Sequence, residues 1–419
     1  MPVLALLLPL VACVEAPSTN DASSVVVDGG IPDASMARDA AVPPDASTPP
    51  DAGPLDAAVA DAAFPPDAAY MLPDVVIDRS LAWSDATLLD DSTAVGLSQL
   101  LSSMCDGVSP GVMLDHWLRK FGTTAHSERF GPVLLADEIA SQHGPDPSAW
   151  PVDTLPIEIT GVHNRIDLQS QAHCGEFRVS AASVHPIYRP LHFIWLFRME
   201  GTDCTQVARR WAELSTLDDQ AFRTAARAML LEHLTTSRFL IAETVEFTVS
   251  PWEWRQWRPQ PNPDVNDPSL PCVLENPPLF QQVDRDSVNA PGATRDAFLA
   301  FVENNADALD ARTLLIPEEF RAPSIRAAQG VPWVPLDLTG VSESTLQAHP
   351  TLRQNLEMVG CAACHATDAP FVQTAEDRTR SPFYTRELEA RRDLLRRYAL
   401  GERPSVPFGP LQTGYVLPP

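Results

Sequence analysis

A long segment of low complexity, residues 14–77, most constrains what this 419-residue chain can fold into. Asp recurs there every five or six residues, usually followed by Ala, among many prolines and very few aromatic residues. Such a composition cannot bury enough apolar surface to offset the entropy of the chain. Its eleven acidic residues and one basic residue also make it self-repelling. We therefore expect residues 14–77 to be a disordered stalk and the folded body to begin at about residue 78.

The first thirteen residues have the features of an export signal. Their apolar run, VLALLLPLVA, is too short to cross a bilayer but suits the core of a signal peptide. Small residues just before Cys13 resemble the lipobox of bacterial lipoproteins, although no Lys or Arg precedes the run. The resemblance implies a lipid anchor on Cys13 and a place on the periplasmic or cell-surface face of the outer membrane. An ordinary signal peptide with a coincidental Cys is the alternative.

The charge of the chain argues against nucleic acid as a partner. Its formal net charge is −25 at pH 7, and its only Lys is Lys120. Because phosphate binding requires clustered Lys and Arg, we expect no nucleic-acid partner. After the signal run, no apolar stretch is long enough for a transmembrane helix, so we expect the membrane to be reached through the N-terminal lipid.

The pattern of apolar residues from 78 to 335 predicts an α+β domain. Residues 88–104 and 109–122 have the three- and four-residue spacing of helices. Segments 155–168, 174–184, 191–199 and 238–249 alternate or run apolar with β-branched and aromatic residues, as strands do. Two further segments, 205–235 and 295–310, have a helical pattern. Strands that follow one another with few crossover helices predict a mainly antiparallel sheet with flanking helices.

Three strings in this domain resemble those of a group of uncharacterised secreted proteins from GC-rich bacteria. They are His163-Asn164-Arg165-Ile166-Asp167-Leu168, His173-Cys174-Gly175-Glu176-Phe177-Arg178 and Pro251-Trp252-Glu253-Trp254-Arg255. That group has an NRxDL string, a CGExR string and a later tryptophan-arginine segment, and often ends in C-x-x-C-H. The resemblance covers most of residues 150–370 and implies no established activity.

The charged residues of the first two strings fall on adjacent predicted strands. Because charges on paired strands usually pair with each other, we expect a cross-strand ion-pair network of Arg165, Asp167, Glu176 and Arg178. The alternative is a ligand or catalytic cleft around His163, His173 and Glu176. The nearby tryptophans are expected to pack against the core, with glycan or protein binding as the alternative: Trp252, Trp254 and Trp257.

The sequence Cys361-Ala362-Ala363-Cys364-His365 has the C-x-x-C-H spacing at which haem is attached to c-type cytochromes. Two thioether bonds would fix the porphyrin, and the adjacent His would ligate the iron. Zinc fits less well because it needs four ligands and no second Cys/His pair is in place. The motif could instead be a redox dithiol or a chance match. Helices expected from Pro350 and from Ser381 make residues 336–419 resemble a small all-α cytochrome c domain.

The second axial ligand of such a haem is not evident. Small cytochromes of this type use a Met after the motif, yet residues 366–419 hold neither Met nor His. Met358 lies on the proximal side, so we expect His349, twelve residues before Cys361, to ligate the iron. Pro350 biases His349 towards an extended conformation, which suits a loop ligand. A His of the middle domain or an open position could take its place.

Cysteine usage agrees with export. With Cys13 assigned to the lipid and two cysteines to the C-x-x-C-H motif, four of the seven remain: Cys105, Cys174, Cys204 and Cys272. An even number in an exported chain predicts two disulfides, with three possible pairings. We favour Cys174 with Cys204, because the segments between them have the pattern of an antiparallel pair. Buried free thiols are the alternative.

These features together predict a protein of four parts: a lipoprotein signal over 1–13 whose Cys13 carries the lipid, a stalk over 14–77, an α+β domain over 78–335 and a haem domain over 336–419. We expect one covalent haem c, electron transfer to a redox partner protein, and an α+β domain that docks the chain to that partner. A surface binding or structural lipoprotein without redox-active haem is the alternative. A hydrolase using His163 or His173 has the least support, because no nucleophile with a partnered base is visible.

Overall fold

The computed structural model describes residues 71–402 except for short internal gaps, which are 90–94, 124–130, 169–172, 186–190, 202, 248–251, 265–269, 280–281, 312–313, 328–334, 359–373 and 376. Cys13 and nearly all of the stalk lie outside the described residues. So do Cys361, Cys364 and His365 of the C-x-x-C-H motif.

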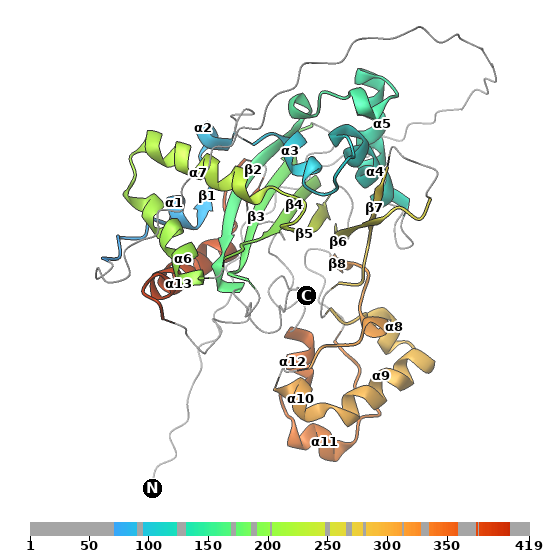
Figure 1. The fold of residues 1–419 in the computed structure, drawn as a ribbon. Coiled ribbons are helices and arrows are strands. Elements are labelled where there is room, and N and C mark those ends of the chain that lie inside the picture. Colours follow the sequence, from blue (N-terminus) through green and yellow to red (C-terminus); the bar gives the residue numbers. More distant parts are fainter. Residues whose placement is uncertain are drawn as a thin grey trace, which may run out of the picture. The chain divides into compact units, whose positions relative to one another are not determined.

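An antiparallel sheet organises the described part of the chain (Figure 1). Its strands pair in chain order from the first to the seventh, and the eighth pairs with the sixth. This confirms the predicted α+β class with a mainly antiparallel sheet. The strands are β1 (Ala82–Trp83), β2 (Ile157–Arg165), β3 (Glu176–Ser183), β4 (Leu191–Arg198), β5 (Phe239–Glu246), β6 (Trp252–Pro261), β7 (Cys272–Glu275) and β8 (Ile325–Ala327).

The helices occur before, between and after the strands. The helical pattern over 205–235 forms two helices, because Asp218 caps a new one by accepting a hydrogen bond from the Ala221 amide. Within the described residues, none of the helices is both long and apolar enough to cross a membrane. The helices are α1 (Ile77–Ser80), α2 (Ala86–Leu89), α3 (Leu97–Ser102), α4 (Pro110–Thr123), α5 (Gly131–His143), α6 (Cys204–Glu213), α7 (Asp219–His233), α8 (Arg285–Asn289), α9 (Ala293–Asn304), α10 (Ala306–Asp310), α11 (Glu343–Ala348), α12 (Leu352–Met358) and α13 (Pro382–Ala399).

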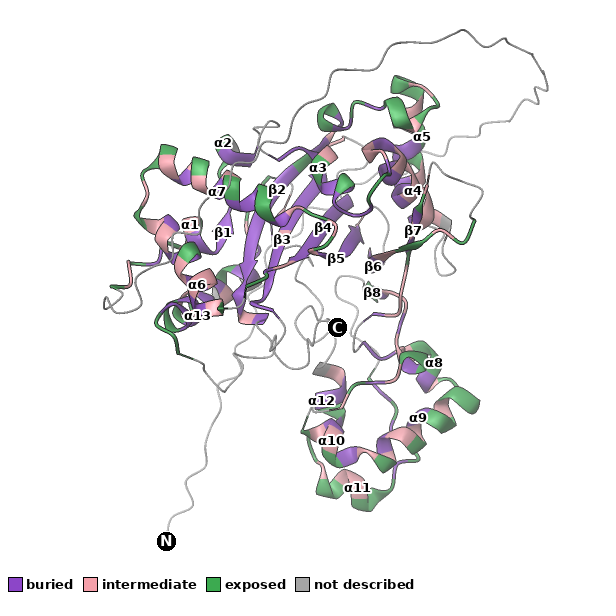
Figure 2. Ribbon diagram, viewed as in Figure 1, coloured by how far each residue is buried: buried purple, intermediate pink, exposed green. Residues whose placement is uncertain are grey.

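One face of the sheet carries a layer of buried aromatic side chains. Figure 2 shows that the central strands of the sheet are buried along most of their length. Trp117 of α4 packs edge-on against Phe193 and Trp195 of β4, with ring centroids 5.0 and 5.4 Å apart. Phe177 of β3 lies 5.9 Å from Trp211 of α6. Because burying one such side chain contributes roughly 2 to 3 kcal/mol, this layer holds α4 and α6 to the sheet.

The folded body begins several residues before the predicted boundary at 77/78. Val75 is buried, and Leu72 and Ile77 pack against the same hydrophobic cluster. The Val76 amide donates a hydrogen bond to the Ser215 hydroxyl at 2.8 Å. The last residues assigned to the stalk therefore pack with the body, because this stretch has the apolar side chains that the Asp-Ala repeats lack.

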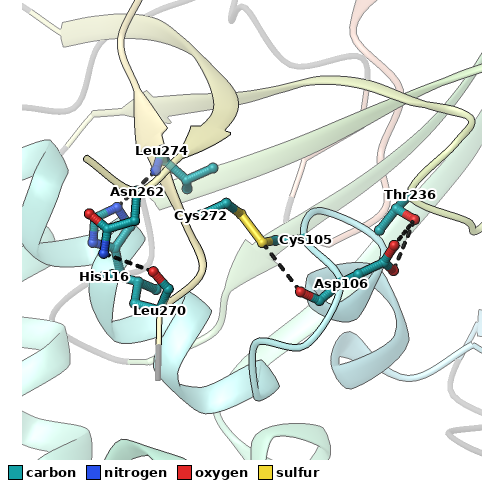
Figure 3. The surroundings of a disulfide bond; sticks show 8 residues. All are labelled: Cys105, Asp106, His116, Thr236, Asn262, Leu270, Cys272 and Leu274. Atoms are coloured by element: carbon teal, nitrogen blue, oxygen red, sulfur yellow. Dashed lines mark hydrogen bonds between the residues drawn. A yellow bond between two sulfur atoms is a disulfide. The ribbon is translucent and has the colours of Figure 1, made fainter. Parts of the chain in front are cut away.

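Two disulfides join the four cysteines of the described region. Cys174 is bonded to Cys204, with Cα atoms 5.0 Å apart, as predicted, and β3 and β4 between them are antiparallel neighbours. The other disulfide joins Cys105, in the loop after α3, to Cys272 of β7, with Cα atoms 6.3 Å apart. Figure 3 shows it beside the hydrogen bonds from the Thr236 hydroxyl to the Asp106 carboxylate.

A second hydrophobic cluster lies in the chain between Val283 and Leu356. Phe298 and Val302 of α9 pack there with Leu352 and Leu356 of α12. Helix α13 does not belong to this cluster. Its buried stripe packs with the sheet cluster instead: Tyr384, Leu388, Leu395 and Tyr398.

The two helices expected to enclose the C-x-x-C-H motif thus belong to different clusters. Helix α13 lies beside α6, whose Arg209 donates a hydrogen bond to the Ala399 carbonyl at 2.9 Å (Figure 1). The separate all-α domain predicted for residues 336–419 is therefore not confirmed by the described residues. The predicted stripe on α13 is apolar as expected, but α6 and the sheet domain, rather than α12, supply the surface that covers it.

Burial lowers the pKa of five histidines of the sheet domain, which are His116, His163, His173, His192 and His233. For His192 of β4, burial lowers the pKa to about 4. An unfolded histidine titrates near 6.5. The folded pKa of His192 lies below the unfolded one. Its contribution to the free energy of unfolding is therefore complete above pH ~6.5 and is lost as the pH falls from there towards the folded pKa.

We expect the free energy of unfolding to decrease as the pH falls from about 7 to about 5, because the unfolded chain then takes up protons that the folded histidines do not. His192 alone should account for on the order of 2 kcal/mol of this decrease. Urea denaturation of the wild type and of His192→Gln at a series of pH values measures how much of the decrease is due to His192. Identical pH slopes for the two proteins would contradict the buried, neutral state of His192.

Candidate functional site

His163 is the centre of a buried group of polar side chains on the sheet face opposite the aromatic layer. Its Nδ1 lies 2.7 Å from the hydroxyl of Tyr384 on α13, and its Nε2 lies 2.8 Å from the hydroxyl of Ser180 on β3. Burial, assisted by the Arg391 cation, lowers the pKa of His163 well below its usual value. Burial likewise raises the pKa of Tyr384 to about 12. The imidazole is therefore neutral and the phenol keeps its proton.

His163 and Ser180 could be taken for a catalytic base and its nucleophile. The hydrogen bonds around them do not support these roles. The Ser180 hydroxyl donates to the Gly161 carbonyl at 3.3 Å. One tautomer satisfies every group, in which Tyr384 donates to Nδ1 and the Nε2–H of His163 donates to Ser180. His163 then presents no lone pair to Ser180 and cannot take its proton. Both side chains are also buried, which disfavours a hydrolase centred on His163.

The alternative, a cleft around His163, His173 and Glu176, is not supported by the contacts of these side chains. His173 is engaged in its own turn, where its Nδ1 accepts a hydrogen bond from the Gly175 amide at 3.2 Å. Glu176 is fully buried and is paired with Arg178 at 2.6 Å. In the part of the chain that the structure describes, no cluster of three His, Cys, Asp or Glu side chains is placed to hold a metal ion.

The charged residues of the two strings do pair, but along the chain rather than across the strands. Arg165 contacts both carboxylate oxygens of Asp167, the closest at 2.8 Å. Arg178 contacts Glu176 on its own strand. The predicted cross-strand arrangement is corrected accordingly. Glu176 and Arg178 are two apart on β3 and project from the same face, whereas Asp167 lies in the 3-10 turn that follows Arg165, at the end of β2.

Helix α13 adds a third buried pair to this group. Arg391 contacts Glu387 on the same helix and lies 3.7 Å from Asp167. Burial raises the pKa of Asp167, but the Arg165 and Arg391 cations outweigh it and lower the pKa to about 2. Three guanidinium groups thus face three carboxylates, which supports the structural interpretation of these residues.

The tryptophans of the third string pack as expected. Trp254 and Trp257 on β6 are buried, and Trp257 lies 5.9 Å from Phe121 of α4. Trp252 is half-buried against Phe247 at 6.0 Å. Their placement favours core packing over a glycan-binding surface.

His349 is the one expected iron ligand that the structure describes. It follows α11, with Nδ1 3.5 Å from Asp310 and Nε2 3.2 Å from Asp307. A ligating histidine commonly binds metal through one nitrogen while a carboxylate holds the other. The contact of Nδ1 with Asp310 fits that arrangement. The contact of Nε2 is with an almost fully exposed carboxylate, and it would have to be released for ligation.

Sequence reasoning did not identify three partners of the His163 group: Ser180, Tyr384 and Arg391. The one available signal was Arg391, a charged residue in the otherwise apolar stripe of Tyr384, Leu388 and Leu395. A charge in such a position indicates a buried counter-charge on the facing element.

Comparisons with known proteins assign neither a family nor a function to this chain. No family model, no curated protein and no solved structure matches this chain. The NRxDL and CGExR resemblance therefore stays an expectation.

We expect Glu176→Gln to lower the free energy of unfolding by on the order of 3 kcal/mol, because it removes the fully buried carboxylate charge that contacts the Arg178 guanidinium at 2.6 Å. Glu232→Gln is the matched control, since its pair with Arg210 is largely exposed and should cost less than about 1 kcal/mol. Urea denaturation compares the two, and haem spectra should be unchanged in both. A loss of partner binding in Glu176→Gln at unchanged stability would favour the cleft instead.

Proposed function

We propose that this chain is an exported, lipid-anchored protein that carries one covalent haem c and transfers electrons. The observation that carries the proposal is how the cysteines are distributed. The four cysteines of the described region are joined to each other in two disulfides, which are typical of exported proteins. None of them is left to pair with Cys361 or Cys364, whose spacing with His365 is that of a haem attachment motif.

In this proposal Cys361 and Cys364 would hold the haem through thioether bonds, and His365 would ligate its iron. A haem bound in this way would supply a one-electron redox centre. The described chain flanks the motif, with α12 before it and with Thr374 near His163 of the sheet domain after it. His349, with Nδ1 held by Asp310, is the proposed second ligand.

The proposed location follows from the N-terminus. Cys13 is the proposed lipid attachment site on the outer membrane, at its periplasmic or cell-surface face. The acidic stalk would then hold the folded body away from the lipid surface, within reach of a redox partner protein. The net charge of −25 supports a protein partner over nucleic acid.

A second candidate is a surface binding or structural lipoprotein whose motif holds no redox-active haem. It is favoured by the polar group around His163, in which the buried charges are balanced among themselves. Such a group stabilises a fold without requiring a ligand.

Expression with a cytochrome maturation system should yield a coloured membrane fraction whose haem stays on the chain through denaturation, because thioether bonds survive unfolding. Cys361→Ala with Cys364→Ala should abolish this haem, measured by haem staining of a denaturing gel. Cys13→Ser is the control and should keep the haem while moving the chain into the soluble exported fraction. A colourless wild type would overturn the proposal in favour of the second candidate.

If His349 ligates the iron, the ferric wild type should be low-spin, and His349→Ala should convert it to high-spin because one strong axial ligand is lost. The absorption spectrum distinguishes the two states. His143→Ala, at an exposed histidine, is the control and should leave the spectrum unchanged. A wild type that is already high-spin and binds carbon monoxide would show that the sixth position is open.

A further inference from the structure

We propose that His163 is a pH-sensitive latch for helix α13: its neutral imidazole holds the helix on the sheet, and protonation loosens the helix. The latch is made entirely of described residues, and it does not depend on the presence of haem. Loosening α13 exposes its apolar stripe together with the polar face of β2 and β3. The surface that the folded body presents therefore changes with pH.

The Nδ1 atom of His163 forms the hydrogen bond with α13. It lies 2.7 Å from the Tyr384 hydroxyl, whereas Nε2 lies 2.8 Å from the Ser180 hydroxyl of β3. In the neutral tautomer that satisfies these groups, Nε2 carries the hydrogen and Nδ1 accepts the bond that Tyr384 donates. An added proton goes onto Nδ1, because this ring nitrogen carries no hydrogen. Protonation thus removes the acceptor of the Tyr384 hydroxyl.

The surroundings of His163 also oppose a positive charge. The imidazole is fully buried, and four guanidinium groups act on it, two from the strands and two from the C-terminal part of the chain. They belong to Arg391, Arg178, Arg380 and Arg165. Burial, assisted by these cations, lowers the pKa of His163 well below its usual value. The docked ring therefore takes up a proton much less readily than a ring that water can reach.

The carboxylates around α13 contact these arginines. The pairs are Asp78 with Arg380, Asp167 with Arg165, Glu176 with Arg178, and Glu387 with Arg391. Asp167 stays ionised, because the Arg165 and Arg391 cations outweigh burial and lower its pKa to about 2. Burial raises the pKa of Glu387, so protonation of Glu387 favours the docked helix and opposes the latch. Loosening in acid is therefore assigned to His163.

The sign and size of the effect follow from the two states of His163. In the opened state the exposed imidazole titrates near 6.5. Its pKa is lower in the docked state, so docking is strongest above pH ~6.5 and weakens as the pH falls below that value. Between pH 7.5 and about 5.5 the equilibrium constant for opening should rise about ten-fold. The apolar stripe still packs with the sheet cluster, so the change consists of more frequent local opening.

Hydrogen exchange of the full chain, followed by mass spectrometry, measures this opening as the protection of α13 amides relative to their intrinsic exchange rate. In the wild type, protection should fall about ten-fold from pH ~7.5 to ~5.5. In His163→Gln it should not fall, because a Gln amide can accept from Tyr384 and donate to Ser180 but takes up no proton. The amides of β4 report global unfolding in the same samples.

His192→Gln is the matched control, since His192 is also a buried histidine of the sheet and burial lowers its pKa to about 4. It should keep the wild-type fall at α13 and reduce the pH dependence at β4. An equal fall at α13 in the wild type and in His163→Gln would overturn the proposal. So would identical protection of α13 and β4 at every pH, since α13 would then open only when the whole domain unfolds.

Tyr384→Phe gives a second test that does not depend on the folding of His163→Gln. It removes the hydroxyl that bonds to His163 and preserves the shape of the side chain. Protection of the α13 amides at pH ~7.5 should fall about five-fold, which corresponds to the loss of one hydrogen bond. Unchanged protection would show that this bond does not hold the helix, and the latch would be refuted.

Discussion

A polar group inside a protein is costly unless a partner satisfies it, and the sheet face around His163 depends on this constraint. The side chains of His163, Arg165 and Glu176 lie on the face opposite the aromatic layer, and all three are buried away from water. Helix α13 supplies some of these partners. Tyr384 is hydrogen-bonded to His163, and Arg391 lies beside Asp167. Its apolar stripe alone would bury it against α6, but these polar contacts define where along the sheet it sits.

This dependence has a consequence for the organisation of the C-terminal region. Helix α12 is packed in the second hydrophobic cluster, whereas α13 is packed on the sheet domain. In the proposed function, the haem-binding segment between them is therefore attached at each end to a different cluster.

The two disulfides add a covalent constraint of a different kind. Cys174–Cys204 closes a loop of 30 residues around two neighbouring strands, whereas Cys105–Cys272 joins positions 167 residues apart. In the chain-entropy model, a bond across so long a loop stabilises the fold by roughly 5 kcal/mol. The same assignment leaves Cys361 and Cys364 outside both disulfides.

The sequence by itself determined the α+β class and the positions of β2 to β5, because alternation and apolar runs report local geometry directly. It favoured the Cys174–Cys204 pairing without deciding among the three possible ones. It also indicated that Tyr384, Leu388 and Leu395 share a buried stripe. It could not show what the stripe packs against, since periodicity states that a face is covered and not which element covers it. Only the tertiary structure placed Tyr384 on His163 and paired Glu176 with Arg178 along the strand, because these choices depend on which polar groups must find partners once the sheet is buried.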